Sequence, residues 1–163
     1  IFLEAKGLYG FFRTDLRQEV PLGVEGAVPI GKASVTRQGR DLTIVTYGAM
    51  VWTALQAADT LAEQGVEAEV VDLRSLVPLD EETVFESVAK TNRVLVLHED
   101  TRRGGLAGEL AALIADERFY FLDAPIRRVT APDTPVPYAP PLEHDFLPKA
   151  EQVVEAANRL IRE

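Results

Sequence analysis

The chain has 163 residues, enough for one domain with a sizeable core, and its apolar (47 %) and charged (26 %) fractions are those of an ordinary globular protein. A formal net charge of −9 opposes binding to nucleic acid or to anionic membranes, and no apolar run reaches the length of a membrane span. The absence of cysteine excludes disulfides and cysteine-ligated metal sites, and it is typical of a cytoplasmic protein.

The first 28 residues differ in pattern from the rest of the chain. Ile1-Phe2-Leu3 is a strand-like apolar run, and prolines and glycines from Pro21 to Gly26 interrupt any regular structure after it. We interpret residues 1–28 as a linker that enters the domain proper, in a chain that is a fragment or has lost its N-terminal part. The domain proper is then expected over residues 29–163.

Strands and helices alternate from residue 29 onwards. Short runs of β-favouring residues predict strands at 33–37, 42–47, 68–73, 94–97 and 126–130. Apolar residues at helical spacing predict helices over 51–62, after Asp80, after Gly104-Gly105 and over 149–163, with Pro148 in the first turn of the last one. This order predicts an α/β fold with three α/β/α layers and a mostly parallel sheet.

Asp80 is the expected N-cap of the second helix, because a carboxylate there accepts from free backbone amides. Leu79 and Val84 occupy the positions of a hydrophobic staple across that cap.

One candidate active site follows the most apolar strand. His98-Glu99-Asp100 lies where ligands bind in open α/β sheets, and Gly104–Gly108 opens the next helix, where a nucleotide phosphate could dock. Together they support an alternative function, a self-sufficient nucleotide-binding or enzymatic domain. The opposing interpretation is a polar loop in which Arg102 and Arg103 pair with the acids, while Gly108 lets the helix approach a neighbour.

Two further segments suggest contacts with other proteins. Residues 131–141 contain four prolines within 132–140, so they form either a rigid connector or a docking surface. Asp123 precedes Ala124-Pro125, and an acid held at such a stiff turn meets a basic partner with little loss of entropy.

Several motifs, in one order, resemble the β-subunit family of thiamine-diphosphate-dependent 2-oxo acid dehydrogenases (E1). They are Ile1–Glu4, Val28–Ala33, Thr43–Val51, Val71–Leu76, Pro78–Thr83, Leu122–Pro125 and the proline-rich run. The resemblance covers essentially the whole chain. Val96–Asp100 and Ala139–Glu143 resemble the branched-chain (2-oxoisovalerate) members more than the pyruvate members.

The resemblance implies that residues 29–163 are the transketolase C-terminal-like domain of such a subunit, and that residues 1–28 end its pyrimidine-binding domain. The family carries out oxidative decarboxylation of a 2-oxo acid with acyl transfer to lipoamide on the E2 subunit. Its thiamine diphosphate and Mg²⁺ bind between the α- and β-subunits, through the half that is absent here. No catalytic, cofactor-binding or metal-binding residue is therefore expected in this chain, and His98 does not match the family's catalytic histidine.

The family also implies partners. The C-terminal domain packs against a second β-subunit, belongs to an assembly with the E1 α-subunit, and helps to receive the basic peripheral subunit-binding domain of E2. Asp123 matches an acidic family position near that contact, and the closing helix is expected nearby. The sequence does not identify the 2-oxo acid.

Overall fold

The computed structural model describes residues 1, 3, 8 and 28–163 of the chain. Within them the strands are β1 (Ser34–Arg37), β2 (Leu42–Thr46), β3 (Ala68–Asp72), β4 (Val94–Thr101) and β5 (Arg127–Ala131). The helices are α1 (Met50–Glu63), α2 (Glu81–Thr91), α3 (Leu106–Arg118), the 3-10 turn η3 (Phe119–Phe121), α4 (Pro140–Phe146) and α5 (Ala150–Arg162). The predicted alternation is confirmed, and η3 and α4 are additions to it.

The described strands form one sheet in the order β1-β3-β2-β4-β5. Strands β3, β2, β4 and β5 pair in parallel, whereas β1 pairs antiparallel with β3. The prediction of a mostly parallel sheet is therefore confirmed, with β1 as the antiparallel edge and β5 as the parallel edge. All five residues of β2 are buried, as its continuous run of β-favouring residues predicts for a central strand.

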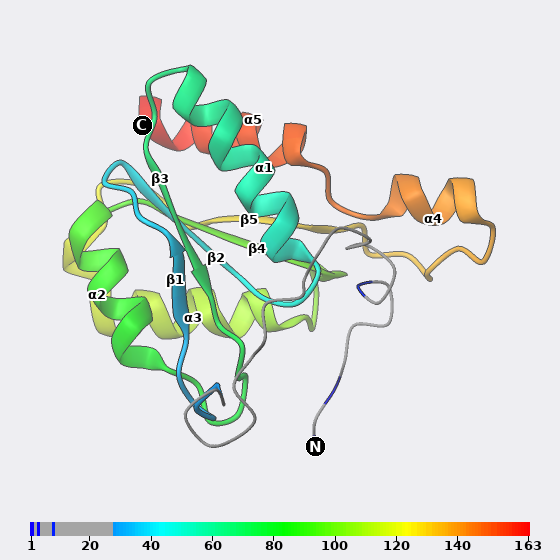
Figure 1. Ribbon diagram of the computed structural model, residues 1–163, viewed down its shortest axis with the longest axis horizontal. Helices are drawn as coiled ribbons and strands as arrows, with labels where there is room; N and C mark the ends of the chain where they lie inside the picture. Colours follow the sequence, from blue (N-terminus) through cyan, green and yellow to red (C-terminus); the bar gives the residue numbers. More distant parts are fainter. Residues whose placement is uncertain (2, 4–7, 9–27) are drawn as a thin grey trace, which may run out of the picture.

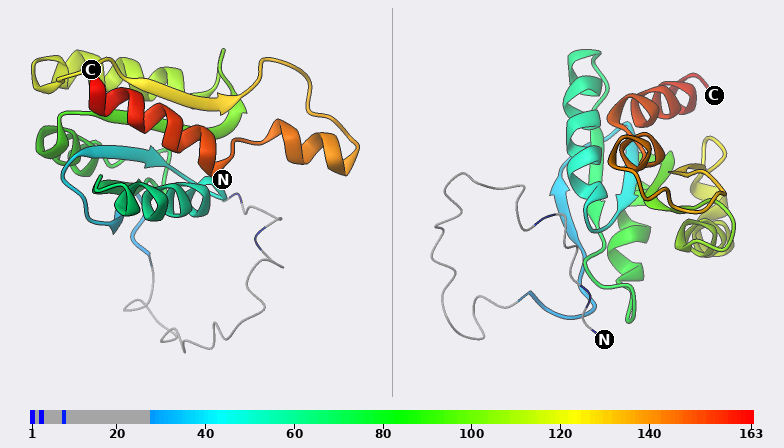
Figure 2. Two further views of the ribbon diagram at one scale, coloured as in Figure 1. Left: turned by 90° about the horizontal axis from the view of Figure 1, so that it is seen from above. Right: turned by 90° about the vertical axis from the view of Figure 1, so that its right-hand side faces the viewer.

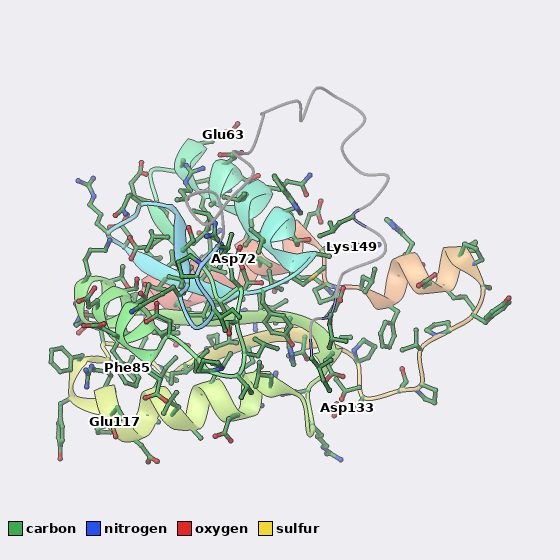
Figure 3. All side chains as sticks on the ribbon, turned by 60° about the horizontal axis from the view of Figure 1, so that its bottom comes forward. Glu63, Asp72, Phe85, Glu117, Asp133 and Lys149 are labelled. Carbon is green, nitrogen blue, oxygen red and sulfur yellow. The ribbon has the colours of Figure 1, made fainter. Side chains whose placement is uncertain are left out.

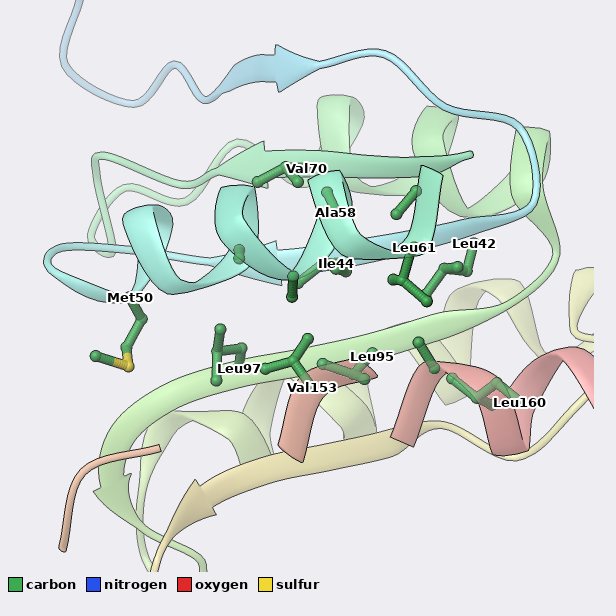
Figure 4. Close-up of a cluster of buried hydrophobic side chains, with 14 of the residues drawn as sticks. Leu42, Ile44, Met50, Ala58, Leu61, Val70, Leu95, Leu97, Val153 and Leu160 are labelled. Carbon is green, nitrogen blue, oxygen red and sulfur yellow. The ribbon is translucent and has the colours of Figure 1, made fainter. Parts of the chain in front are cut away.

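Helices cover both faces of the sheet, which gives the predicted three layers (Figures 1 and 2). On one face α1 and α5 enclose an apolar cluster, drawn in Figure 4, that includes Leu61, Leu95 and Leu160. On the other face α2 and α3 pack on a second cluster around Val96, with Phe85 and Ile114. Burial on both faces explains why the central strands carry few polar residues.

The start of α2 is built as the sequence predicts. The Asp80 carboxylate accepts hydrogen bonds from the Thr83 amide (3.4 Å) and hydroxyl (2.9 Å). It also accepts from the Ala33 amide at 2.9 Å, and Lys32 Nζ lies 3.5 Å away. One buried carboxylate therefore ties the N-terminus of α2 to the segment that enters β1.

Three predicted boundaries need correction. Strand β4 continues to Thr101, so His98-Glu99-Asp100 lies within the strand and not after it. Helix α4 begins at Pro140, because prolines fit the first turn of a helix, where the missing amide has no partner to lose. Pro148 precedes Lys149, the N-cap of α5, instead of lying in the first turn.

The predicted strand at Ile1–Leu3 and the linker to residue 28 lie largely outside the described residues, so that division into domains stays a prediction. Among the described helices, none is both long enough and apolar enough to cross a bilayer.

Candidate functional site

The first candidate site lies at the carboxyl end of the sheet, between β2 and β4. These neighbouring strands continue into helices on opposite faces, since α1 follows β2 and α3 follows β4. Open α/β sheets bind ligands at such a switch point. Tyr47 follows β2 and His98 lies in β4, so the fold brings both side chains to this point.

His98 is a buried histidine with one ring nitrogen satisfied. Its Nδ1 lies 3.4 Å from the Tyr47 hydroxyl, and its Nε2 is buried without a hydrogen-bond partner in the described structure. Burial lowers the pKa of His98, with Asp100 acting to raise it and Arg128 to lower it further. Burial also raises the pKa of Tyr47, helped by the nearby charges of Asp100 and Glu99. Both groups are therefore neutral at pH 7.

The side-chain position of Gly105, the N-cap of α3, is filled from within the protein, whereas that of Gly104 is open. A Cβ atom on Gly105 would lie 2.3 Å from the Thr101 carbonyl oxygen and 2.5 Å from Cε1 of His98. The same atom on Gly108 would meet nothing closer than Arg128 Nη1 at 3.6 Å. The close approach predicted at Gly108 is thus found at Gly105, where the His98 ring occupies the space beside the N-cap.

The arginines after β4 do not pair with the acids of the strand. Arg103 Nε lies 3.5 Å from Asp133 Oδ2, and Arg102 donates to the Arg128 carbonyl at 3.2 Å. The Asp100 carboxylate accepts from the Thr101 amide at 2.7 Å. The predicted pairing of Arg102 and Arg103 with Glu99 and Asp100 is therefore wrong, because the loop turns the guanidinium groups toward β5. In the described part of the chain, no group of three or more His, Cys, Asp or Glu side chains could hold a metal ion.

The second candidate, Asp123, lies at the opposite, amino end of the sheet. Its amide donates to the Asn92 carbonyl at 2.9 Å, and its carboxylate lies 3.4 Å from Arg93 Nη1. The Asp123 side chain is 57 % exposed, so a partner can reach it. Arg93 also donates to the Leu160 carbonyl at 3.2 Å, which places the end of α5 beside Asp123, where the closing helix was expected.

An aromatic cluster beside Asp123 was not among the predicted site residues. Phe119 is 64 % exposed and Tyr120 is 97 % exposed, and the Asn92 side chain bonds to the Phe121 carbonyl. Aromatic side chains are enriched at the centres of protein interfaces. Three consecutive aromatics at the end of a helical pattern are the sequence signal that could have indicated this surface.

The proline-rich segment leads into α4, which projects from the layered body (Figure 1). We call Pro132–Phe146 the arm. Val136, Tyr138 and Leu142 of the arm are exposed, whereas Phe146 is buried and fixes its end to the body. The arm therefore presents apolar groups away from the core, as a docking surface does.

Comparison with known proteins identifies the relatives of this chain. The family described as "Transketolase, C-terminal domain" matches residues 31–153. Three beta subunits from Bacillus subtilis are similar over 99–100 % of the chain: those of acetoin:2,6-dichlorophenolindophenol oxidoreductase (45 % identical), 2-oxoisovalerate dehydrogenase (44 %) and the pyruvate dehydrogenase E1 component (43 %). The chain covers only 46–48 % of these proteins, so it spans about half their length.

Solved structures agree with this assignment. A chain described as "Split gene transketolase, inactive beta4 tetramer" superposes with a TM-score of 0.71 and 31 % identity, over 83 % of this chain and 43 % of that one. A transketolase from Pichia stipitis shares the fold at 18 % identity, with a TM-score of 0.55 over 81 % of this chain and 18 % of that one. The chain therefore belongs to the transketolase C-terminal domain family.

Proposed function

We propose that this chain is the assembly and docking domain of the β-subunit of a 2-oxo acid dehydrogenase E1. The observation that carries the proposal is its similarity, along almost its entire length, to β-subunits of oxidoreductases, each about twice as long. The part that such a subunit has in addition would supply the chemistry. The full protein would oxidatively decarboxylate a 2-oxo acid together with an α-subunit.

The described residues do not fit a thiamine diphosphate site. The cofactor needs acidic ligands for the Mg²⁺ that holds its diphosphate, and the described residues contain no such cluster. At Gly105, the N-cap of α3, the His98 ring also fills the space where a side chain would lie. We therefore assign cofactor binding to the other part of the full protein and derive no catalytic step from this domain.

The substrate of the full protein is not distinguished by similarity alone. Relatives named for acetoin, 2-oxoisovalerate and pyruvate are 45 %, 44 % and 43 % identical to the chain. In our proposal the residues of this domain do not line the substrate pocket, so their identity to a relative does not depend on which substrate that relative uses. A branched-chain 2-oxo acid or pyruvate remains the proposed substrate class.

Asp123 is the proposed centre of a contact with the basic peripheral subunit-binding domain of E2. The chain carries a net charge of −9, which attracts a basic partner over long range. Asp123 is exposed on a turn held by the Asn92 carbonyl, and the exposed Phe119 and Tyr120 beside it could bury apolar surface around the ion pair. Arg93 competes for the carboxylate, so binding requires that the partner's cations replace or share this ion pair.

Replacing Asp123 with Lys tests this contact. We expect Asp123→Lys to weaken binding of an E2 peripheral subunit-binding domain at least about tenfold, because the new lysine, together with Arg93, repels a basic partner. Binding to the unaltered chain should also fall steeply as salt is raised, because screening weakens exposed charge pairs. Calorimetry at low and high ionic strength measures both effects.

Glu109→Lys is the matched control, since Glu109 is an exposed acid in the first turn of α3, at the far end of the helix from Phe119 and Asp123, and the net charge changes equally. An equal loss of affinity in both variants would reduce the effect to net charge. If Asp123→Lys binds as tightly as the unaltered chain at low salt, Asp123 is only a turn residue and the docking assignment fails.

A further inference from the structure

Two adjoining cavities follow the edge strand β5. The larger, about 480 Å³, extends along β5 from Arg128 to Asp133 and reaches Phe146 of α4. The smaller, about 350 Å³, extends from Ile126 to Arg128 and reaches Arg159 of α5. Arg102, Arg128 and Gln152 line both, and we call the joined space the β5 groove. In Figure 3, Asp133 and Lys149 are labelled toward one end of the molecule, and Phe85 and Glu117 toward the other. Asp133 lines the larger cavity, which therefore lies at the carboxyl end of β5.

The acids that line the β5 groove already have partners. Asp133 pairs with Arg103, and Asp145 pairs with Lys149. Glu155 pairs with Arg159 one turn further along α5. These carboxylates are therefore neutralised locally and do not cancel the remaining positive charge of the groove.

The positive charges of Arg102 and Arg128 are not compensated locally, since neither forms an ion pair with a described carboxylate. Arg102 Nη1 donates to the Arg128 carbonyl at 3.2 Å, and Arg128 Nη1 donates to the Arg102 carbonyl at 3.3 Å. A guanidinium group has five N–H donors, so this exchange fixes both side chains and leaves most of their donors unused. Two immobilised cations thus lie together in a chain whose net charge is −9.

A neighbouring side chain adds further donors. The Gln152 carbonyl oxygen accepts from the Lys149 amide at 2.9 Å, which leaves its NH₂ group available. The unused groups of Arg102, Arg128 and Gln152 are all donors, so a ligand that satisfies them must be rich in acceptor oxygens.

We propose that the β5 groove binds a small molecule that carries a phosphate or diphosphate group. Phosphate oxygens match the fork of a guanidinium and form charge-assisted hydrogen bonds with it. Both cavities are open to solvent, and each has a volume within the range of small-molecule sites, about 300–1,000 Å³. A second copy of this chain is a poor occupant, because symmetric pairing of β5 edges would oppose arginine to arginine. This site is independent of the E1 assignment and of Asp123.

Pyrophosphate is the probe for this site. We expect it to bind the chain and to shift the amide NMR signals of Arg127–Ala131 and Gln152. The double change Arg102→Gln and Arg128→Gln should weaken binding at least tenfold, while Arg40→Gln should leave it unchanged. Arg40 is the matched control because its side chain is 80 % exposed and lies outside the groove. Inorganic phosphate and citrate, tested in parallel, separate a phosphate site from a general anion site.

Gln152→Glu provides a second test that preserves the fold. Glutamate at this position can still accept from the Lys149 amide, so α5 keeps its cap while a negative charge enters both cavities. Pyrophosphate affinity should fall at least tenfold in this variant, with an unchanged melting temperature in the absence of ligand. The proposal is overturned if no shifts appear at millimolar pyrophosphate, if they map away from β5, or if Arg40→Gln loses as much affinity as the double variant. Equal binding of citrate would show an anion site without phosphate preference and would also overturn it.

Discussion

At the residue scale, burial decides what each polar side chain can do. His98 looks catalytic in the sequence because it stands beside two acids at the end of a strand. In the structure its ring is enclosed by Gly105 and Tyr47, and its Nε2 has no partner among the described atoms. Asp123 looks modest in the sequence, yet it is exposed beside an aromatic cluster. Residue type suggested chemistry for both side chains, and the structure adds that a partner can reach Asp123 but not the buried His98.

His98 predicts a pH dependence of stability. Its pKa in the folded state is lowered from 6.5, so below pH 6.5 the unfolded state binds more protons. The contribution of His98 to the free energy of unfolding is therefore complete above pH 6.5 and declines as pH falls toward the folded-state pKa. One proton limits the slope to about 1.4 kcal/mol per pH unit.

Urea unfolding at pH 7.0 and at pH 5.5 measures this effect, with His98→Asn as the non-titrating comparison. Asp80, whose pKa is lowered from 3.8, titrates below this window, and the His98→Asn comparison cancels any contribution from Asp72, whose pKa is raised from 3.8 by burial. Equal losses of stability between the two pH values in both proteins would contradict the role of His98.

At the element scale, caps and short anchors set where helices begin. Asp80 caps α2 and also holds the segment before β1 through the Ala33 amide. Gly105 lets α3 start directly against His98 in β4. Pro140 starts α4 in a segment whose prolines predicted either a rigid connector or a docking surface. Each boundary depends on one or two residues, which explains why small errors in the predicted bounds did not alter the order of elements.

Asp80→Ala should destabilise the chain by about 2–4 kcal/mol, since it removes the cap of α2 and leaves the Ala33 amide without its acceptor. Chemical denaturation at pH 7, followed by circular dichroism, measures the change. Glu81→Ala is the control, because this exposed first-turn acid contributes only about 0.3–1 kcal/mol through the helix dipole. Similar effects of the two substitutions would show that the second contact of Asp80 is not stabilising.

The cap also predicts how the effect varies with acidity. Burial alone would raise the pKa of Asp80, but hydrogen bonds from Ala33 and Thr83, with the charge of Lys32, lower it overall. The stabilisation is therefore present above pH 3.8 and is lost as pH falls through the folded-state pKa.

At the scale of the whole molecule, the layers leave three distinct outer surfaces. The amino end of the sheet carries Asp123 and its aromatic neighbours, and β5 carries the arginine-lined groove. The arm projects from the body with apolar side chains exposed (Figure 1).

We expect the chain to self-associate through surfaces that include the arm, because burying Val136 and Tyr138 removes apolar area from water. Sedimentation at micromolar concentration should give a mass above the 17.9 kDa of the monomer. Tyr138→Glu should shift the chain toward monomer, whereas Val77→Glu, an exposed apolar position outside the arm, should not. A chain that stays monomeric at about 1 mM, or equal effects of the two changes, would remove the arm from the interface.

The sequence by itself determined the alternation of strands and helices, the three layers, the cap at Asp80 and the family. These features depend on local periodicity, on one capping side chain and on motifs that are contiguous in the chain. Only the tertiary structure decided the antiparallel place of β1, the close approach at Gly105 and the pairing of Arg93 with Asp123. It also decided the meeting of Arg102 with Arg128, which are 26 residues apart. Such contacts depend on strand order and side-chain direction across the sheet, and no short stretch of sequence contains that information.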